Sequence, residues 1–214
     1  MQCRGIREIG SPQDRSLRRA LPLFVIAAWF VSPAWAGPDL CPVQDFAIEA
    51  ALGNAVAQYN LGVELYRGER LEQNLEQAAA LWRMAVASGN VPAHNSLGYL
   101  VFFGRGVQRD PEEGLRLWRF AAERGHAESQ FHLASVYMTG RHLPRDYALA
   151  YAWANTSEHY AKAVSELGGG PQVAQDARAL KRQARENLAG RDRKRAEKLA
   201  AKFIASYGPR EAGR

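Results

Sequence analysis

The chain has 214 residues, of which 47% are hydrophobic and 23% are charged, and it contains two cysteines. This composition is typical of an ordinary folded protein and excludes a chain that is disordered throughout. The formal net charge of +6 is unevenly distributed. Residues 37–175 hold 11 basic and 15 acidic side chains, whereas residues 176–214 hold 12 basic and five acidic ones. The sequence therefore predicts a mildly acidic body followed by a strongly basic C-terminal segment.

The first 36 residues have the three parts of a secretory signal. A basic stretch precedes an apolar run over residues 21–31, and the segment closes on Ala34-Trp35-Ala36. This order predicts a signal peptide over residues 1–36 that is cleaved after Ala36, and a periplasmic or secreted protein. The alternative is an uncleaved membrane anchor, but the apolar run is shorter than the roughly 20 residues that a membrane span needs.

The segment that follows, residues 37–53, is predicted to cap the N-terminal end of the fold. Within it, Asp45 is expected to N-cap a short helix over residues 45–52, and Phe46 and Ile48 are available to cover the next helices. Because Cys3 would leave with the signal, Cys41 cannot form an internal disulfide. Two alternatives remain for Cys41, an intermolecular bridge or a thiol packed near the N-terminus.

Self-similarity with a period of 36 residues dominates the middle of the chain. Fixed-period repetition on this scale is the signature of a repeat architecture, in which each unit is one supersecondary element. The columns that recur include Gly53, Gly89 and Gly125; Leu61, Leu97 and Leu133; Gly68, Gly104 and Gly140; and Asn74, Asp110 and Asp146.

The columns predict that one unit is a helix, a turn, a second helix and a turn. In the first unit, Leu61 and Leu65 have the spacing of a buried helical stripe, and Gly68 stands where that helix must end. Asn74 then falls at the start of the second helix, where its side chain can accept hydrogen bonds from free backbone N–H groups.

Mid-helix glycines and tryptophans recur in the first two units. Gly62 and Gly98 lie inside the first helices, where glycine costs about 1 kcal/mol relative to alanine, so we expect the paired helix to approach closely there. Trp82 and Trp118 lie on the second helices at the position that faces the first helix.

These residues resemble the Sel1-like repeat, a relative of the tetratricopeptide repeat. The resemblance rests on Ala57-Gln-Tyr-Asn-Leu-Gly62, and on Gly104-Arg-Gly-Val-Gln-Arg-Asp110 followed by Leu117-Trp118 and Ala121-Ala122. It implies an all-α fold, an α/α solenoid of three 36-residue helix-turn-helix repeats over residues 54–166, with N- and C-terminal capping helices. The last unit loses the Ala-Ala pair and the closing glycine after Trp153, which is expected of a terminal repeat.

Residues 167–214 are predicted to form a basic C-terminal cap of two amphipathic helices that follow the Gly168-Gly-Gly-Pro171 break. The basic side chains are expected on solvent, where they are either a solvated face or a contact for an acidic partner or a membrane surface; nucleic acid is not expected. These side chains are Arg178, Lys181, Arg182, Arg185, Arg193, Lys194, Lys198 and Lys202.

A candidate partner-binding surface lies on the first helices, opposite the buried stripe. In tetratricopeptide-like stacks the first helices line the concave wall, and the middle unit is unusually apolar there. The alternative is that these aromatic residues pack on neighbouring helices or under the C-terminal cap. The residues expected to contact a partner are Asn60, Glu64, Ser96, Tyr99, Leu100, Phe103 and His132.

The sequence predicts no catalytic residue, cofactor or metal. The closest pair of histidines, His126 and His132, lacks the four-residue spacing on one helix face that zinc sites use. The resemblance therefore implies a protein–protein interaction scaffold or regulator of a complex in the cell envelope. The alternative is a weak cell-wall-active or ester/amide hydrolase built on the same scaffold.

Overall fold

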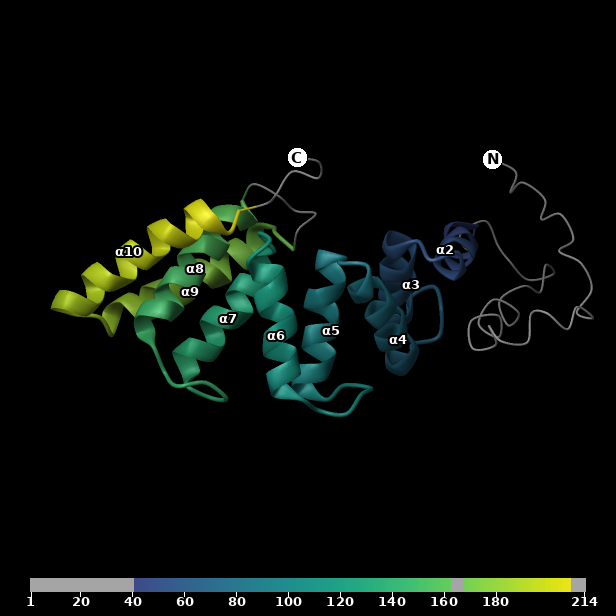
Figure 1. The fold of residues 1–214 in the computed structure, drawn as a ribbon, viewed down its shortest axis with the longest axis horizontal. Helices are drawn as coiled ribbons and strands as arrows, with labels where there is room; N and C mark the ends of the chain where they lie inside the picture. The colour runs from purple at the N-terminus through teal and green to yellow at the C-terminus, as the bar shows by residue number, and fades with distance from the viewer. Residues whose placement is uncertain (1–40, 163–167, 209–214) are drawn as a thin grey trace, which may run out of the picture. The chain divides into compact units, whose positions relative to one another are not determined.

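The structure is a computed structural model that describes residues 41–162 and 168–208 (Figure 1). These residues form nine helices and no strand. The predicted signal peptide and its cleavage site lie outside these residues. The helices are α2 (Cys41–Ala51), α3 (Ala55–Arg67), α4 (Leu75–Ala87), α5 (Val91–Phe103), α6 (Pro111–Ala122), α7 (Ala127–Thr139), α8 (Tyr147–Ala161), α9 (Pro171–Glu186) and α10 (Gly190–Ser206).

The contacts divide the chain into two units, one that ends at Ala85 and one that begins at Val86. In the first unit, α2 packs on α3, and Phe46 lies against a core that includes Leu61 and Leu65. Two expectations for this cap are wrong. The helix begins at Cys41 rather than at Asp45, and Ile48 is 46% exposed, so it does not cover the first repeat.

The predicted turn chemistry is confirmed. Each first helix ends at a glycine with a positive φ, 73° at Gly68, 72° at Gly104 and 70° at Gly140, in the left-handed region that glycine adopts without strain. The second helices α6 and α8 begin after Asp110 and Asp146, whose side chains accept from backbone N–H groups of the first turn.

A tryptophan on the second helix explains the mid-helix glycine of the first. The indole Nε1 of Trp82 donates to the carbonyl of Tyr59 (3.1 Å), and 36 residues later that of Trp118 donates to the carbonyl of Asn95 (3.2 Å). A Cβ placed on Gly98 would lie 2.8 Å from Trp118 Cδ1, closer than carbon atoms pack. Glycine is therefore required where the ring crosses the first helix, as the sequence predicted.

The third repeat breaks this arrangement by one residue. Its tryptophan is Trp153 rather than residue 154, and its ring packs on α10, with centroids 4.5 Å from Phe203 and 5.4 Å from Tyr207. Alanine occupies the glycine column at Ala134, and Ala154 stands in the tryptophan column, and both are fully buried. The last tryptophan therefore anchors the C-terminal cap instead of its own first helix.

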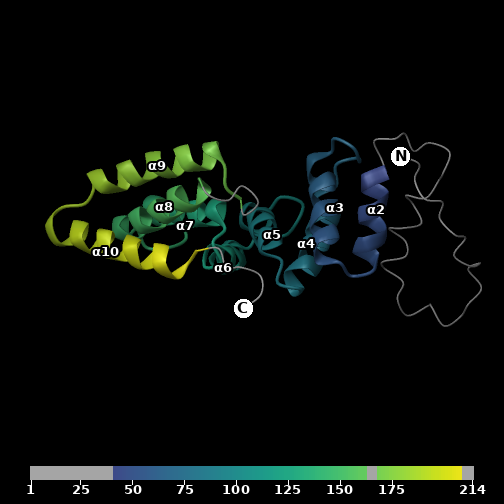
Figure 2. The ribbon, with the colours of Figure 1, turned by 90° about the horizontal axis from the view of Figure 1, so that it is seen from above.

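The C-terminal helices continue the stack. In Figure 2, α8 lies between α9 and α10, and α9 also packs on α7. The predicted amphipathic character of these two helices is confirmed, since Ala177, Leu180, Ala196 and Phe203 are all buried.

Glu158 of α8 holds α9 in place through ion pairs. Its carboxylate accepts from Arg178 Nε (2.9 Å), Lys181 Nζ and Lys162 Nζ (3.2 Å). Burial opposes ionisation of this carboxylate, but the three cations outweigh it and hold the pKa of Glu158 at about 2. Arg178 is exposed as expected while it pairs with Glu158, whereas Lys181 is partly buried, so the expectation that all eight basic side chains lie on solvent is wrong for Lys181.

We expect Trp118→Ala to lower the free energy of unfolding by about 3–5 kcal/mol, the usual cost of emptying a large aromatic site in a core. Trp118 is 1% exposed, and the substitution also removes its hydrogen bond to Asn95.

We further expect Gly98→Ala to destabilise the wild type, because the new methyl group would press on the indole. In the Trp118→Ala background the same change should be neutral or stabilising, because alanine favours helix by about 1 kcal/mol.

Urea titration of the wild type and the three variants of this cycle measures the coupling, and Trp118→Phe provides a milder background if little Trp118→Ala folds. An equal effect of Gly98→Ala in both backgrounds would show that the indole does not set the helix spacing.

Candidate partner-binding surface

The first helices of the repeats expose only part of the predicted contact stripe. Glu64 and Leu100 occupy equivalent positions, and both are buried, at 5% and 0% exposure. Leu100 lies in the core, and the carboxylate of Glu64 accepts from Arg70 Nε at 2.8 Å. Neither side chain can meet a partner in the folded protein, because this column of the repeat faces inward.

The remaining predicted contact residues keep some exposure. Asn60, in the part of the chain that ends at Ala85, is half-buried. In the part that begins at Val86, Ser96, Tyr99 and His132 are half-buried, and Phe103 is 51% exposed. The structure therefore leaves α5 and α7 of the second unit as the candidate surface.

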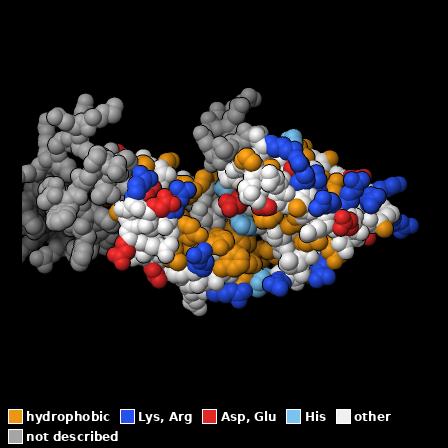
Figure 3. Space-filling model, turned by 180° about the vertical axis from the view of Figure 1, so that it is seen from behind, with side chains coloured by type: hydrophobic (Ala, Val, Ile, Leu, Met, Phe, Trp, Pro, Cys, Tyr) orange, Lys and Arg blue, Asp and Glu red, His pale blue; other side chains and the backbone are white. Residues whose placement is uncertain are grey.

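The exposed Phe103 packs against a cluster of aromatic rings. Its centroid is 4.9 Å from those of Tyr99 and Phe102, and Phe102 in turn packs on Trp118 at 4.7 Å. Trp118 also stacks on His132, with centroids 4.4 Å apart. We call Tyr99, Phe103 and His132 the aromatic patch. Figure 3 shows hydrophobic side chains gathered on one face of the molecule, with histidines beside them.

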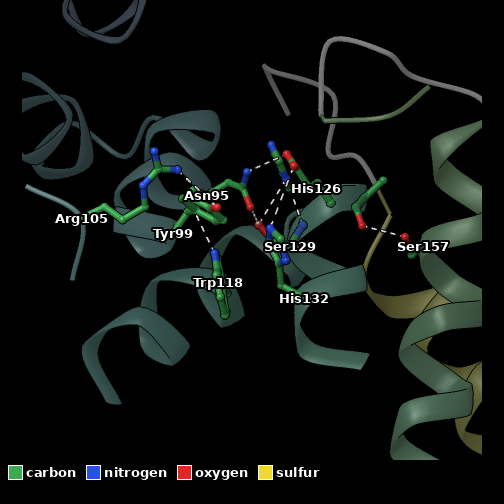
Figure 4. A network of polar contacts seen from close by, with 10 residues as sticks. Asn95, Tyr99, Arg105, Trp118, His126, Ser129, His132 and Ser157 are labelled. Carbon is green, nitrogen blue, oxygen red and sulfur yellow. Dashed lines mark hydrogen bonds and ion pairs between the residues drawn. The ribbon is translucent and has the colours of Figure 1, made fainter. Parts of the chain in front are cut away.

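A buried polar network holds the patch in place (Figure 4). Asn95 of α5 donates to Glu128 of α7 (2.8 Å), and the Ser129 hydroxyl donates to Asn95 Oδ1 (2.7 Å). The Asn95 carbonyl also accepts the indole N–H of Trp118, so α5, α6 and α7 are joined at one residue. The sequence pattern does not single out Asn95, Glu128 or Ser129, because no periodicity marks a contact between different repeats.

His126 begins α7 as its N-cap. Its ring Nδ1 accepts from the backbone N–H of Ser129 (3.3 Å), and the corresponding caps 36 and 72 residues earlier are Asn90 and Asn54. This column could have been recognised in the sequence from the two asparagines.

The histidines of this network are neutral at physiological pH. Burial, together with the nearby His132, lowers the pKa of His126 to about 3, and burial lowers the pKa of His132 to about 4. Burial also raises the pKa of Glu128, although the hydrogen bond from Asn95 opposes the shift.

The arrangement does not suit catalysis, although a serine and a histidine lie together. Ser129 is fully buried, its hydroxyl donates to Asn95, and His126 Nδ1 is occupied by a backbone N–H. A nucleophile needs access to a substrate and a base that is ready to take its proton. In the described part of the chain, no three His, Cys, Asp or Glu side chains are placed to hold a metal ion. Likewise, none of the described helices is both long and apolar enough to cross a membrane.

Comparison with known proteins identifies the repeat. The Sel1 repeat family matches residues 55–90, 91–126 and 127–156. The chain carries three Sel1 repeats. The predicted family resemblance and the all-α solenoid are thereby confirmed, and Sel1 repeats typically serve as scaffolds for protein–protein interaction. None of the curated proteins matches the chain.

Two solved structures resemble this Sel1-repeat chain. One is a protective antigen present in uropathogenic Escherichia coli strains that displays an SLR fold, with a TM-score of 0.56 and 21% identity. The match covers 87% of this chain and 45% of the antigen, so the chain spans less than half the length of that relative. The other is a Sel1 repeat protein from Oxalobacter formigenes, with 28% identity, a TM-score of 0.49, and coverage of 63% of this chain and 98% of that one. The first likeness supports the fold.

We expect His126→Asn to flatten the pH dependence of stability. Unfolded histidine titrates near pH 6.5, whereas His126 stays neutral when folded down to about pH 3. Below pH 6.5 the unfolded chain thus binds a proton that the folded chain excludes, and stability falls by about 1.4 kcal/mol per pH unit. Asparagine keeps the cap without titrating, so between pH 7 and pH 5 the variant should lose about 2 kcal/mol less than the wild type.

Urea titrations across that pH range measure how the free energy of unfolding changes with pH. Any packing lost through the substitution lowers stability equally at every pH and leaves this slope unchanged. His159→Asn is the matched control, because His159 is exposed on α8. Equal slopes for wild type and His126→Asn would contradict a buried neutral cap.

Proposed function

We propose that this Sel1-repeat chain is an exported scaffold or regulator of a cell-envelope complex, and that it binds a protein segment on the α5–α7 face. One observation carries the proposal. Phe103 is a large aromatic side chain, half exposed, on rings that are fixed by packing beneath it. Rigid aromatic anchors are the residues that dominate binding energy at protein interfaces.

The buried network strengthens this proposal. Because Asn95, Glu128 and Ser129 tie α5 to α7 below the patch, the surface is ordered before a partner arrives. Binding to a preorganised surface avoids the entropy of fixing side chains on association.

The double variant Tyr99→Ala plus Phe103→Ala tests the surface. We expect it to lose partners captured by the wild-type protein from envelope extracts while it stays helical and folded, with a melting temperature lowered by the loss of the packed Tyr99 ring. The matched control is Ile48→Ala plus Val56→Ala, which removes two hydrophobic side chains that are 46% and 60% exposed elsewhere in the fold. Retained partners in the first variant, or an equal loss in the control, would contradict the proposed surface.

Export rests on the three-part pattern of residues 1–36. Expression of the full chain in a Gram-negative host should yield a periplasmic protein whose mass corresponds to a new N-terminus at Gly37. Ala36→Leu should block cleavage, because signal peptidase requires a small residue there. A wild-type protein that keeps residues 1–36, or that stays in the cytosolic fraction, would show that the pattern is not a cleaved signal.

A further inference from the structure

Two neighbouring loops carry a row of basic side chains beside the aromatic patch. The loops join α5 to α6 and α7 to α8, and they hold four arginines and one histidine, which we call the basic edge. Figure 3 shows Lys or Arg side chains and a histidine in a row next to the hydrophobic patch. The basic edge consists of Arg105, Arg109, Arg141, His142 and Arg145.

Contacts between the loops make this edge one surface. Arg109 Nη2 lies 3.3 Å from His142 Nε2, and the His142 ring packs edge-on to Phe102 at 5.1 Å. The guanidinium of Arg105 lies 5.6 Å from the centre of the Tyr99 ring, so the edge adjoins the aromatic patch directly.

His142 is held in a costly backbone conformation. Its φ is 71°, and it is the one residue other than glycine with a positive φ in the described part of the chain. The equivalent residue of the middle repeat is Gly106, with φ 66°. A side chain in this region costs about 1 kcal/mol or more, and such strain is concentrated at binding sites. Histidine thus stands, in place of the glycine of the middle repeat, where the two loops meet Phe102.

Three arginines of the basic edge, Arg109, Arg141 and Arg145, lack an acidic partner among the described residues. Arg109 and Arg145 donate to carbonyls at the ends of α5 and α7, and neither they nor the exposed Arg141 form an ion pair with a described carboxylate. Three nearby carboxylates have contacts of their own: Asp110 caps α6, Glu113 pairs with Arg116, and Asp146 caps α8 and pairs with Arg195.

We propose that the aromatic patch and the basic edge together bind an acidic linear peptide that carries one large apolar side chain. The apolar side chain packs on Tyr99 and Phe103, and carboxylates on one side of it pair with the arginines. Arginine suits this role, because its planar guanidinium keeps donors for a carboxylate while it bonds a backbone carbonyl. The inference rests on the proposed function and specifies the chemistry of the partner.

The polarity of the surface favours a peptide over a nucleic acid. Glu128, half-buried and bonded to Asn95, lies 4.0 Å from His132, on the part of the patch that α7 supplies. A nucleic acid carries a negative charge on every phosphate, so the Glu128 carboxylate would repel part of it. A peptide can confine its acidic residues to the arginine side of the surface.

Selection from a displayed library of random 12-residue peptides on the purified full chain tests the proposal. We expect enriched peptides to combine one Phe, Trp or Leu with Asp or Glu residues on one side of it. A synthetic copy of an enriched peptide should bind at least tenfold more weakly to Arg105→Glu plus Arg141→Glu, and also when its own acidic residues become amides. Binding should weaken as salt rises.

The matched control is Arg182→Glu plus Arg185→Glu, which makes the same charge change on exposed residues of α9 and should leave affinity unchanged. The amide peptides test the charge requirement on the wild-type protein, so the result does not depend on folding of the variants. Enriched peptides without acidic residues, an equal loss in the α9 control, or tighter binding of a single-stranded oligonucleotide would overturn the proposal.

The same peptides separate this inference from the proposed function. Neutral peptides that bind the wild type but not Tyr99→Ala plus Phe103→Ala would overturn the acidic partner but support the protein-binding surface. Absence of any selected peptide, or peptides that ignore the aromatic double variant, would overturn both.

Discussion

The hydrogen bond from an indole N–H to a carbonyl of the preceding helix sets the distance between the two helices of a repeat. Trp82 and Trp118 reach across to the carbonyls of Tyr59 and Asn95, and the ring then occupies the space that a Cβ at Gly62 or Gly98 would need. A mid-helix glycine, unfavourable for an isolated helix, is thereby required by the pair. Close approach of the helices also buries the alanines and leucines that line both of them.

The end of the Sel1 array follows from the failure of this pairing. With its tryptophan displaced to Trp153, the third repeat turns the ring toward Phe203 and Tyr207 of α10. The same helix presents Glu158 to the cations of α9. One helix, α8, thus completes a repeat on one side and receives the C-terminal cap on the other, with aromatic contacts for α10 and ion pairs for α9.

Two departures from the repeat lie near the candidate surface. His126 stands in a cap column that holds Asn54 and Asn90 in the first two repeats, and His142 stands where the middle repeat has Gly106 and the first repeat has Arg70. The first departure lies under the polar network that joins α5 to α7, and the second joins the basic edge to the ring cluster. Both replacements have a physical cost, desolvation for His126 and backbone strain for His142.

The 36-residue period by itself determined the repeats, their turns and the close approach at Gly62 and Gly98, because each is a local requirement of φ, capping or packing that recurs in register. The period also placed Phe103 on the outward side of α5, whereas Tyr99, expected on the same side, packs partly on the core and on His132 of α7. Tertiary structure alone decided that Glu64 and Leu100 face inward and that Arg178 and Lys181 pair with Glu158. It also decided that Asn95, Glu128 and Ser129 form one network. These outcomes depend on contacts between helices that are distant along the chain, and one helix's sequence does not specify which neighbour covers each of its faces.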